Sequence, residues 1–127
     1  MGYRYRKHYT RDEARALLPQ IRAWLKQVLH LRNWLAKADD RLGQLLAKGH
    51  DAGGELVNDW LKMVHELRNL LAEFQKREII IKDIESGLVD FPAIIGGKEV
   101  FLCWERDEDD VEYWHDLDAG KMGRERL

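Results

Sequence analysis

This sequence has few cysteines and no long apolar runs, and each of these absences excludes a class of protein. A single cysteine, Cys103, rules out an intramolecular disulfide and favours a reducing compartment, so we expect a cytoplasmic protein. No apolar run reaches the roughly 18 residues of a membrane span, and no apolar segment of a secretory signal follows the basic N-terminus. We therefore expect no membrane partner. The 127 residues fit one domain with one core, spanning residues 1–127.

The net charge is small, at −2, but the charges are unevenly distributed along the chain. Up to Lys48 the chain has 11 basic and 4 acidic residues, and from Gly49 onward it has 10 basic and 19 acidic residues. The halves could neutralise each other within one fold or across a homo-oligomer, or the basic half could bind nucleic acid or an acidic partner. We favour neutralisation, because a domain that binds nucleic acid usually has a positive charge overall.

Four basic residues of the N-terminal half share one face at helical spacing and could follow a row of phosphates. They are Arg11, Arg15, Arg22 and Lys26. Charges of this kind also surround a soluble helix that has no ligand, and the sequence contains no known motif for reading DNA or RNA. Nucleic-acid binding is therefore the alternative that we favour least.

Prolines number two, and only Pro19 interrupts an otherwise continuous helical pattern. Apolar residues recur there at steps of three and four: Ile21, Trp24, Val28, Leu31, Leu35, Ala38, Leu42 and Leu45. A capping box formed by Thr10 and Glu13 marks the start. We predict a helix over residues 11–47, which Pro19 should bend near Arg15 or divide after a first turn.

A glycine-rich segment at residues 47–54 predicts a loop, and a second helical pattern follows it as far as Arg77. Its apolar positions are Val57, Trp60, Val64, Leu67, Leu71 and Phe74. Two long helices with a short connection predict an antiparallel, coiled-coil-like hairpin over about residues 10–77. Each helix carries a second apolar row that a two-helix hairpin cannot bury, so we expect a homodimer built on these helices.

From Ile79 the apolar period changes from helical to alternating, which indicates strands over about residues 79–84, 91–95 and 98–105. Gly96 and Gly97 suit a two-residue type I′ hairpin turn, and Pro92 belongs at an edge or a strand start. Residues 111–114 should form a further short strand or a helical turn. The predicted fold class is α+β: a helical hairpin followed by a small antiparallel sheet of about three strands within residues 78–127.

Six short motifs stand out in the C-terminal part: Lys82–Glu85, Gly87–Pro92, Val100, Leu102–Trp104, Trp114–His115 and Gly123–Arg124. The opening adds Tyr9–Thr10, Glu13–Ala14 and Leu17–Pro19. Together they resemble the signature of an uncharacterised bacterial family, domain of unknown function 2203, over nearly the whole chain. That family usually has glycine-glutamate at positions 107–108 and proline-leucine at positions 126–127, where this chain has other pairs. The resemblance implies no particular activity.

Four donors near the expected strand ends could bind a divalent metal: Asp83, Glu85, Asp90 and His115. Carboxylate oxygens suit Mg²⁺, Mn²⁺ or Ca²⁺, and the imidazole of His115 would admit Zn²⁺ or Fe²⁺. No established metal-binding spacing is present. The competing interpretations are a solvated acidic turn with ion-paired carboxylates, and carboxylates that act together in acid–base catalysis.

Two further sets of residues in the C-terminal part could form a functional site. Trp104, Trp114 and Arg124 could form a small-ligand pocket, with indole walls and a guanidinium for an anionic group. Cys103 and His115 could form a nucleophile and its base, but the apolar neighbours of the cysteine favour a small buried core residue. We favour an oligomeric interaction or adaptor module with a protein partner over an enzyme. A metal- or small-ligand-binding protein is the first alternative, and nucleic-acid binding is the second.

Overall fold

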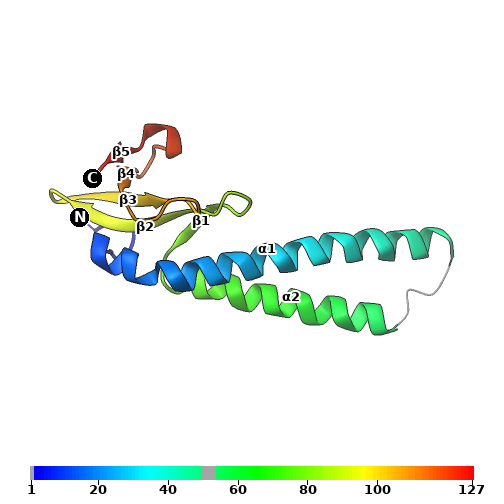
Figure 1. Ribbon diagram of the computed structural model, residues 1–127. Helices are drawn as coiled ribbons and strands as arrows, with labels where there is room; N and C mark the ends of the chain where they lie inside the picture. The colour runs from blue at the N-terminus through cyan, green and yellow to red at the C-terminus, as the bar shows by residue number, and fades with distance from the viewer. Residues whose placement is uncertain (1, 50–53) are drawn as a thin grey trace.

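The computed structural model describes residues 2–49 and 54–127, which form a helical hairpin followed by a β-sheet (Figure 1). Helix α1 (Arg11–Ala47) and helix α2 (Gly54–Gln75) lie side by side and run in opposite directions. The strands are β1 (Ile80–Asp83), β2 (Leu88–Ile95), β3 (Lys98–Trp104), β4 (Tyr113–Asp116) and β5 (Glu125–Arg126), with a 3₁₀ turn, η1 (Lys121–Gly123), before the last one. The predicted α+β fold is confirmed, and the sheet in the described residues has five strands. Residues 50–53 of the predicted loop lie outside the described residues.

Helix α1 begins where the capping box predicts. The Glu13 backbone N–H donates to Thr10 Oγ1 at 3.1 Å, and the Thr10 backbone N–H donates to Glu13 Oε1 at 2.9 Å. The helix then continues through Pro19 to Ala47, so a division after the first turn does not occur. Pro19 is exposed, so the Arg15 carbonyl that loses its partner there can bond to water. In the described part of the chain, no helix combines the length and the apolar character that crossing a membrane requires.

Replacing Thr10 with alanine should lower the free energy of unfolding by about 1 kcal/mol, because the Glu13 N–H loses its acceptor at the helix start. Urea denaturation followed by circular dichroism measures this change. Thr10→Ser is the matched control, since it keeps the hydroxyl, and it should stay close to the wild type. Equal stability of the alanine and serine variants would show that the cap contributes nothing.

The sheet is antiparallel throughout, with strand order β1-β2-β3-β4-β5. Strands β2 and β3 form a hairpin through Gly96 and Gly97, whose φ angles of 58° and 78° are the positive values that a type I′ turn requires. Of the two outcomes predicted around residues 111–114, the structure has a strand, which begins at Tyr113. Strand β5 has two residues, too few to leave a periodic signal in the sequence.

Pro92 lies inside β2 rather than at a strand start, yet it occupies a local edge. Strand β1 pairs with β2 only from Leu88 to Asp90, so β1 has ended before Pro92 is reached. On that side the backbone N–H of Tyr9 donates to the Pro92 carbonyl at 2.7 Å. In an antiparallel strand the nitrogen and carbonyl of one residue point the same way, so the proline nitrogen also faces away from β3. The missing N–H therefore interrupts no ladder bond.

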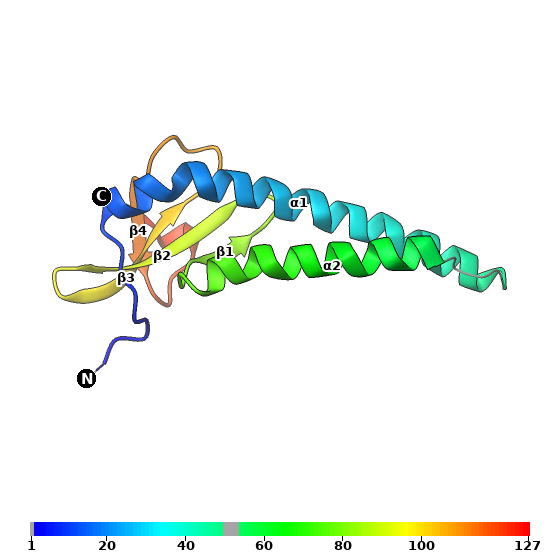
Figure 2. The same ribbon diagram turned by 90° about the horizontal axis from the view of Figure 1, so that it is seen from below.

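One face of the sheet packs on the first half of α1. The helix contributes Ala14, Leu18, Ile21 and Leu25 to the main core. The core residues of β2 and β3 are Val89, Phe91, Ala93, Val100, Leu102 and Trp104. The second half of α1 extends past the sheet alongside α2, as Figure 2 shows. The molecule therefore has a layered part, where helix and sheet share a core, and a projecting part made of the hairpin.

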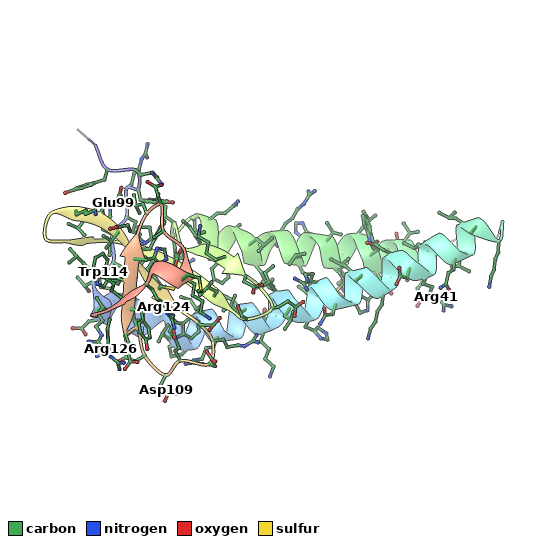
Figure 3. All side chains as sticks on the ribbon, turned by 90° about the horizontal axis from the view of Figure 1, so that it is seen from above. Arg41, Glu99, Asp109, Trp114, Arg124 and Arg126 are labelled. Carbon is green, nitrogen blue, oxygen red and sulfur yellow. The ribbon has the colours of Figure 1, made fainter. Side chains whose placement is uncertain are left out.

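The opposite face of the sheet is covered by both ends of the chain. Tyr5 packs edge-on against Phe101 with ring centroids 5.5 Å apart, and the Tyr5 backbone N–H donates to Glu99 at 3.0 Å. The C-terminal turn lies over the same face (Figure 3), and Arg124 reaches from it towards Cys103. These segments enclose the side chains that this outer face buries.

Candidate metal centre

Three donor side chains of different kinds meet on the outer face of the sheet. Asp90 of β2 stands directly opposite Cys103 of β3 in the strand register, and His115 of β4 stands opposite Phe101, two residues from Cys103. Directly opposite and diagonal neighbours of this kind place side chains within reach of one another. A carboxylate oxygen, the thiol sulfur and a ring nitrogen of the three lie within 4.8 Å of one another. Across residues 2–49 and 54–127, no other group of three such side chains is this close.

All three side chains are buried, since Asp90, Cys103 and His115 are 1%, 0% and 2% exposed. His115 Nε2 lies 3.0 Å from Asp90 Oδ1, and His115 Nδ1 lies 2.8 Å from the Asp116 carbonyl. A carbonyl can only accept, so Nδ1 carries its hydrogen and Nε2 is the nitrogen that faces the group. The second carboxylate oxygen, Asp90 Oδ2, is buried and has no hydrogen-bond partner. A buried acceptor without a partner costs about 1–3 kcal/mol, so it marks a position that a cation would stabilise.

The electrostatics of the group argue against a free thiolate. Burial raises the pKa of the Cys103 thiol to about 11, and the nearby Asp90 charge acts in the same direction. Burial also raises the pKa of the Asp90 carboxyl, against the attraction of His115. The thiol is therefore protonated at neutral pH and is a poor nucleophile, which removes support from the pairing of Cys103 and His115 as a catalytic dyad. A metal ion, in contrast, would displace the thiol proton on binding.

Arg124 closes the group from the side of the C-terminal turn. Its Nη1 lies 3.8 Å from Cys103 Sγ, and its Nη2 donates to Glu108 Oε2 at 2.5 Å. The guanidinium carbon also lies 3.9 Å from the centroid of the Tyr113 ring. The Glu108 carboxylate and the aromatic face therefore hold the arginine in place beside the sulfur, and Figure 3 shows it on the turn above the sheet.

The structure divides the metal ligands predicted from the sequence into two sets. Asp90 and His115 are in contact, whereas Asp83 and Glu85 lie at the turn between β1 and β2. Asp83 accepts hydrogen bonds from the Glu85 backbone and from Ser86, so it stabilises that turn. Glu85 is exposed and pairs with Arg32. Neither belongs to the buried group, and Cys103 stands in their place.

The predicted small-ligand pocket is not assembled. Trp104 is fully buried on the helix side of the sheet, and Trp114, opposite Leu102 in the register, packs against the same core. Arg124 lies on the outer face beside Cys103. The indole Nε1 of Trp104 donates to the Glu108 carbonyl at 3.0 Å, so this polar atom is also satisfied within the chain. The two tryptophans therefore serve the core, and the arginine serves the outer face.

The basic row predicted on helix α1 is largely occupied by the chain itself. Arg15 donates to both carboxylate oxygens of Asp110 at 2.8 Å, and Arg11 lies 3.4 Å from the same group. Arg22 donates to the carbonyls of Arg106 and Glu108 at 2.6 and 2.8 Å. These contacts join the basic N-terminal half to the acidic C-terminal half. Neutralisation within one fold thus accounts for this part of the charge asymmetry.

Comparison with known protein families gives a match over most of the chain. A family model described as Uncharacterized conserved protein (DUF2203) matches residues 7–127. No curated protein and no solved structure matches the chain. Four of the short C-terminal motifs that resemble this family each supply one residue at the buried group: Asp90, Cys103, His115 and Arg124. The match covers nearly the whole chain, which therefore belongs to the family described as Uncharacterized conserved protein (DUF2203).

Proposed function

We propose that this protein binds a divalent transition metal ion, with zinc as the reference ion, through Asp90, Cys103 and His115. The observation that carries the proposal is the meeting of carboxylate, thiol and imidazole within 4.8 Å in the buried outer face of the sheet. Asp90 Oδ2 gives further support, because this buried carboxylate oxygen has only the weak thiol donor of Cys103 beside it.

The donor set selects the class of metal. A thiolate and an imidazole favour zinc, cobalt or iron(II) over magnesium and calcium, which prefer oxygen ligands alone. Three protein ligands leave a fourth tetrahedral position for water or a substrate atom, as in catalytic zinc sites, whereas structural sites use four protein ligands. The hydrogen bond from His115 Nδ1 to the Asp116 carbonyl is the outer contact that usually orients a ligating histidine.

A single cysteine, which forms no intramolecular disulfide, suits a reducing compartment, so we propose a cytoplasmic location.

Cobalt substitution tests the site directly, because a cysteine thiolate bound to Co²⁺ gives a charge-transfer band in the near ultraviolet. The protein is unfolded, freed of metal with a chelator and refolded with Co²⁺, so that burial does not hinder loading. We expect one cobalt per chain, the thiolate band, and displacement of cobalt by Zn²⁺. Cys103→Ser should lose the band, and His115→Gln should weaken cobalt binding by about tenfold or more.

His8→Gln is the matched control. His8 and Glu99 form the other histidine–carboxylate pair among the described residues, with Nε2 and Oε2 2.7 Å apart, and no thiol belongs to that pair. The control variant should bind cobalt like the wild type. Refolded wild-type protein with no thiolate band, and with no rise in melting temperature on addition of Zn²⁺, would contradict the proposal.

The part of the hairpin that extends beyond the sheet favours a second function, the binding of another protein chain. Beyond the sheet, large apolar side chains remain open to solvent, with Leu46 65%, Leu61 55% and Val57 37% exposed. Helix α2 buries only Phe74 fully among its 22 residues, so its apolar row is half covered by α1. We propose that the hairpin joins the protein to a protein partner. Analytical ultracentrifugation of the purified chain tests whether that partner is a second copy.

A further inference from the structure

A groove runs along the side of the hairpin that faces away from the sheet. Its first section is lined by Lys26, Gln27, His30, Leu31, Glu66, Asn69 and Leu70. Its second section, nearer the hairpin tip, is lined by Trp34, Lys37, Ala38, Arg41 and Leu56. On α1 these positions lie across the helix from Leu18, Ile21 and Leu25, which pack on the sheet. The sheet therefore leaves this groove open.

The two walls of the groove carry opposite charge. On α1, Lys26, His30, Lys37 and Arg41 recur at steps of four and seven and form a basic wall. On α2, Glu55, Asp59 and Glu66 recur at the same steps and form a wall that is acidic on balance, with the basic Lys62 between Asp59 and Glu66. Within the part of the chain that the structure describes, none of these side chains forms an ion pair. The floor between the walls is apolar, with Leu31, Trp34, Ala38, Leu56 and Leu70.

We propose that a second copy of this chain occupies the groove, with the two hairpins parallel and related by a two-fold axis along their length. A surface that pairs with itself across such an axis must be self-complementary. In the parallel arrangement, the basic wall of each copy faces the acidic wall of the other at the same height, so Lys37 and Arg41 meet Asp59 and Glu55. An antiparallel arrangement places basic wall against basic wall, which like charges disfavour.

The available area is adequate for such a dimer. From Lys26 to Ala47 the hairpin extends about 33 Å at 1.5 Å per residue. Two helices about 10 Å apart present a face roughly 20 Å wide. The flat area is on the order of 660 Å² per copy, close to the approximately 800 Å² per partner of a stable interface. Because the groove opens away from the sheet, both sheets lie on the outside of the pair and do not obstruct it.

Complementary charge reversal tests the arrangement. One variant reverses the basic wall with Lys26→Glu, Lys37→Glu and Arg41→Glu. The other reverses the acidic wall with Glu55→Lys, Asp59→Lys and Glu66→Lys. Analytical ultracentrifugation over a concentration series should show a dimeric wild type and a dimer affinity weakened about tenfold or more in each variant alone. An equimolar mixture should restore the dimer, and native mass spectrometry should identify it as the heterodimer.

Controls separate charge pairing from folding. Arg68→Glu changes an exposed charge on the other side of α2 and should leave the dimer unchanged. Circular dichroism checks that each variant is helical. If a reversal unfolds the hairpin, Leu70→Gln in the groove floor serves instead and should weaken the dimer while helicity is kept.

The inference rests on the proposed interaction role of the hairpin, and the outcomes distinguish the two. A monomeric wild type at micromolar concentration would contradict the dimer in the groove, but not a hairpin that joins a different protein. A dimer that neither set of reversals weakens would contradict only the groove. A basic-wall variant that pairs with the wild type more tightly than the wild type pairs with itself would show the antiparallel arrangement and overturn the parallel one.

Discussion

Replacing Trp104 with alanine should lower the free energy of unfolding by about 3 to 5 kcal/mol. The side chain is 0% exposed and lies in the core that β2 and β3 share with α1. Its loss leaves a cavity at the centre of the layered part, since core side chains around it can collapse only partly. It also removes one of the two donors to the Glu108 carbonyl, the other being Arg22, and it removes the ring on which Arg22 lies, 4.9 Å from the centroid. Denaturant unfolding followed by circular dichroism measures the change.

Trp60→Ala is the matched control for Trp104. The Trp60 indole also donates one hydrogen bond, to Asp39 at 2.8 Å, but it is half-buried on the hairpin and its bond is exposed. The loss of unfolding free energy should be smaller, about 1 to 2 kcal/mol. Equal losses for the two tryptophans would contradict the placement of the core between sheet and α1.

Replacing Asp90 with alanine should cost about 3 to 5 kcal/mol of unfolding free energy in protein freed of metal with a chelator. The substitution leaves His115 buried at 2% exposure without the partner that now lies 3.0 Å from its Nε2. Removing one member of a buried pair is more damaging than replacing both, because the remaining polar group stays desolvated. Thermal and denaturant unfolding of the metal-free variant give the value.

Asp90→Asn and a double variant serve as controls for this prediction. An asparagine amide can donate to His115 Nε2, so Asp90→Asn should retain much of the stability. Asp90→Ala combined with His115→Phe removes both polar groups and should recover part of the loss. A metal-free Asp90→Ala protein as stable as the wild type would show that the pair contributes nothing, and would weaken the case for a built site.

The helices were predictable because their signals are local. The capping box places the start of α1 at Arg11, and the apolar steps of three and four continue to Ala47. The Gly96–Gly97 turn was equally readable, since positive φ angles at two adjacent positions call for glycine. Of the two outcomes predicted at Pro19, the division after a first turn does not occur, because a helix can continue through an exposed proline when water takes over the unpaired carbonyl.

The buried group was only half predictable. The sequence predicts Asp90 and His115 as donors together with Asp83 and Glu85, because all four lie near expected strand ends, and it favours a core position for Cys103. The alternation of β3 is the signal that could have placed the thiol, because residues 101 and 103 point to one face of the strand and residue 102 points to the other. This alternation alone does not say which strand lies beside β3.

The sequence by itself determined the helices, the hairpin turn, the alternation of the strands and the family, because each of these depends on residues close in the chain or on short motifs. Only the tertiary structure decided that Asp90, Cys103 and His115 meet, since strand register and strand order are set by packing of the whole sheet on α1. It also decided which faces stay open. A basic helix and an acidic helix become two walls of one groove only when the hairpin fixes their relative rotation.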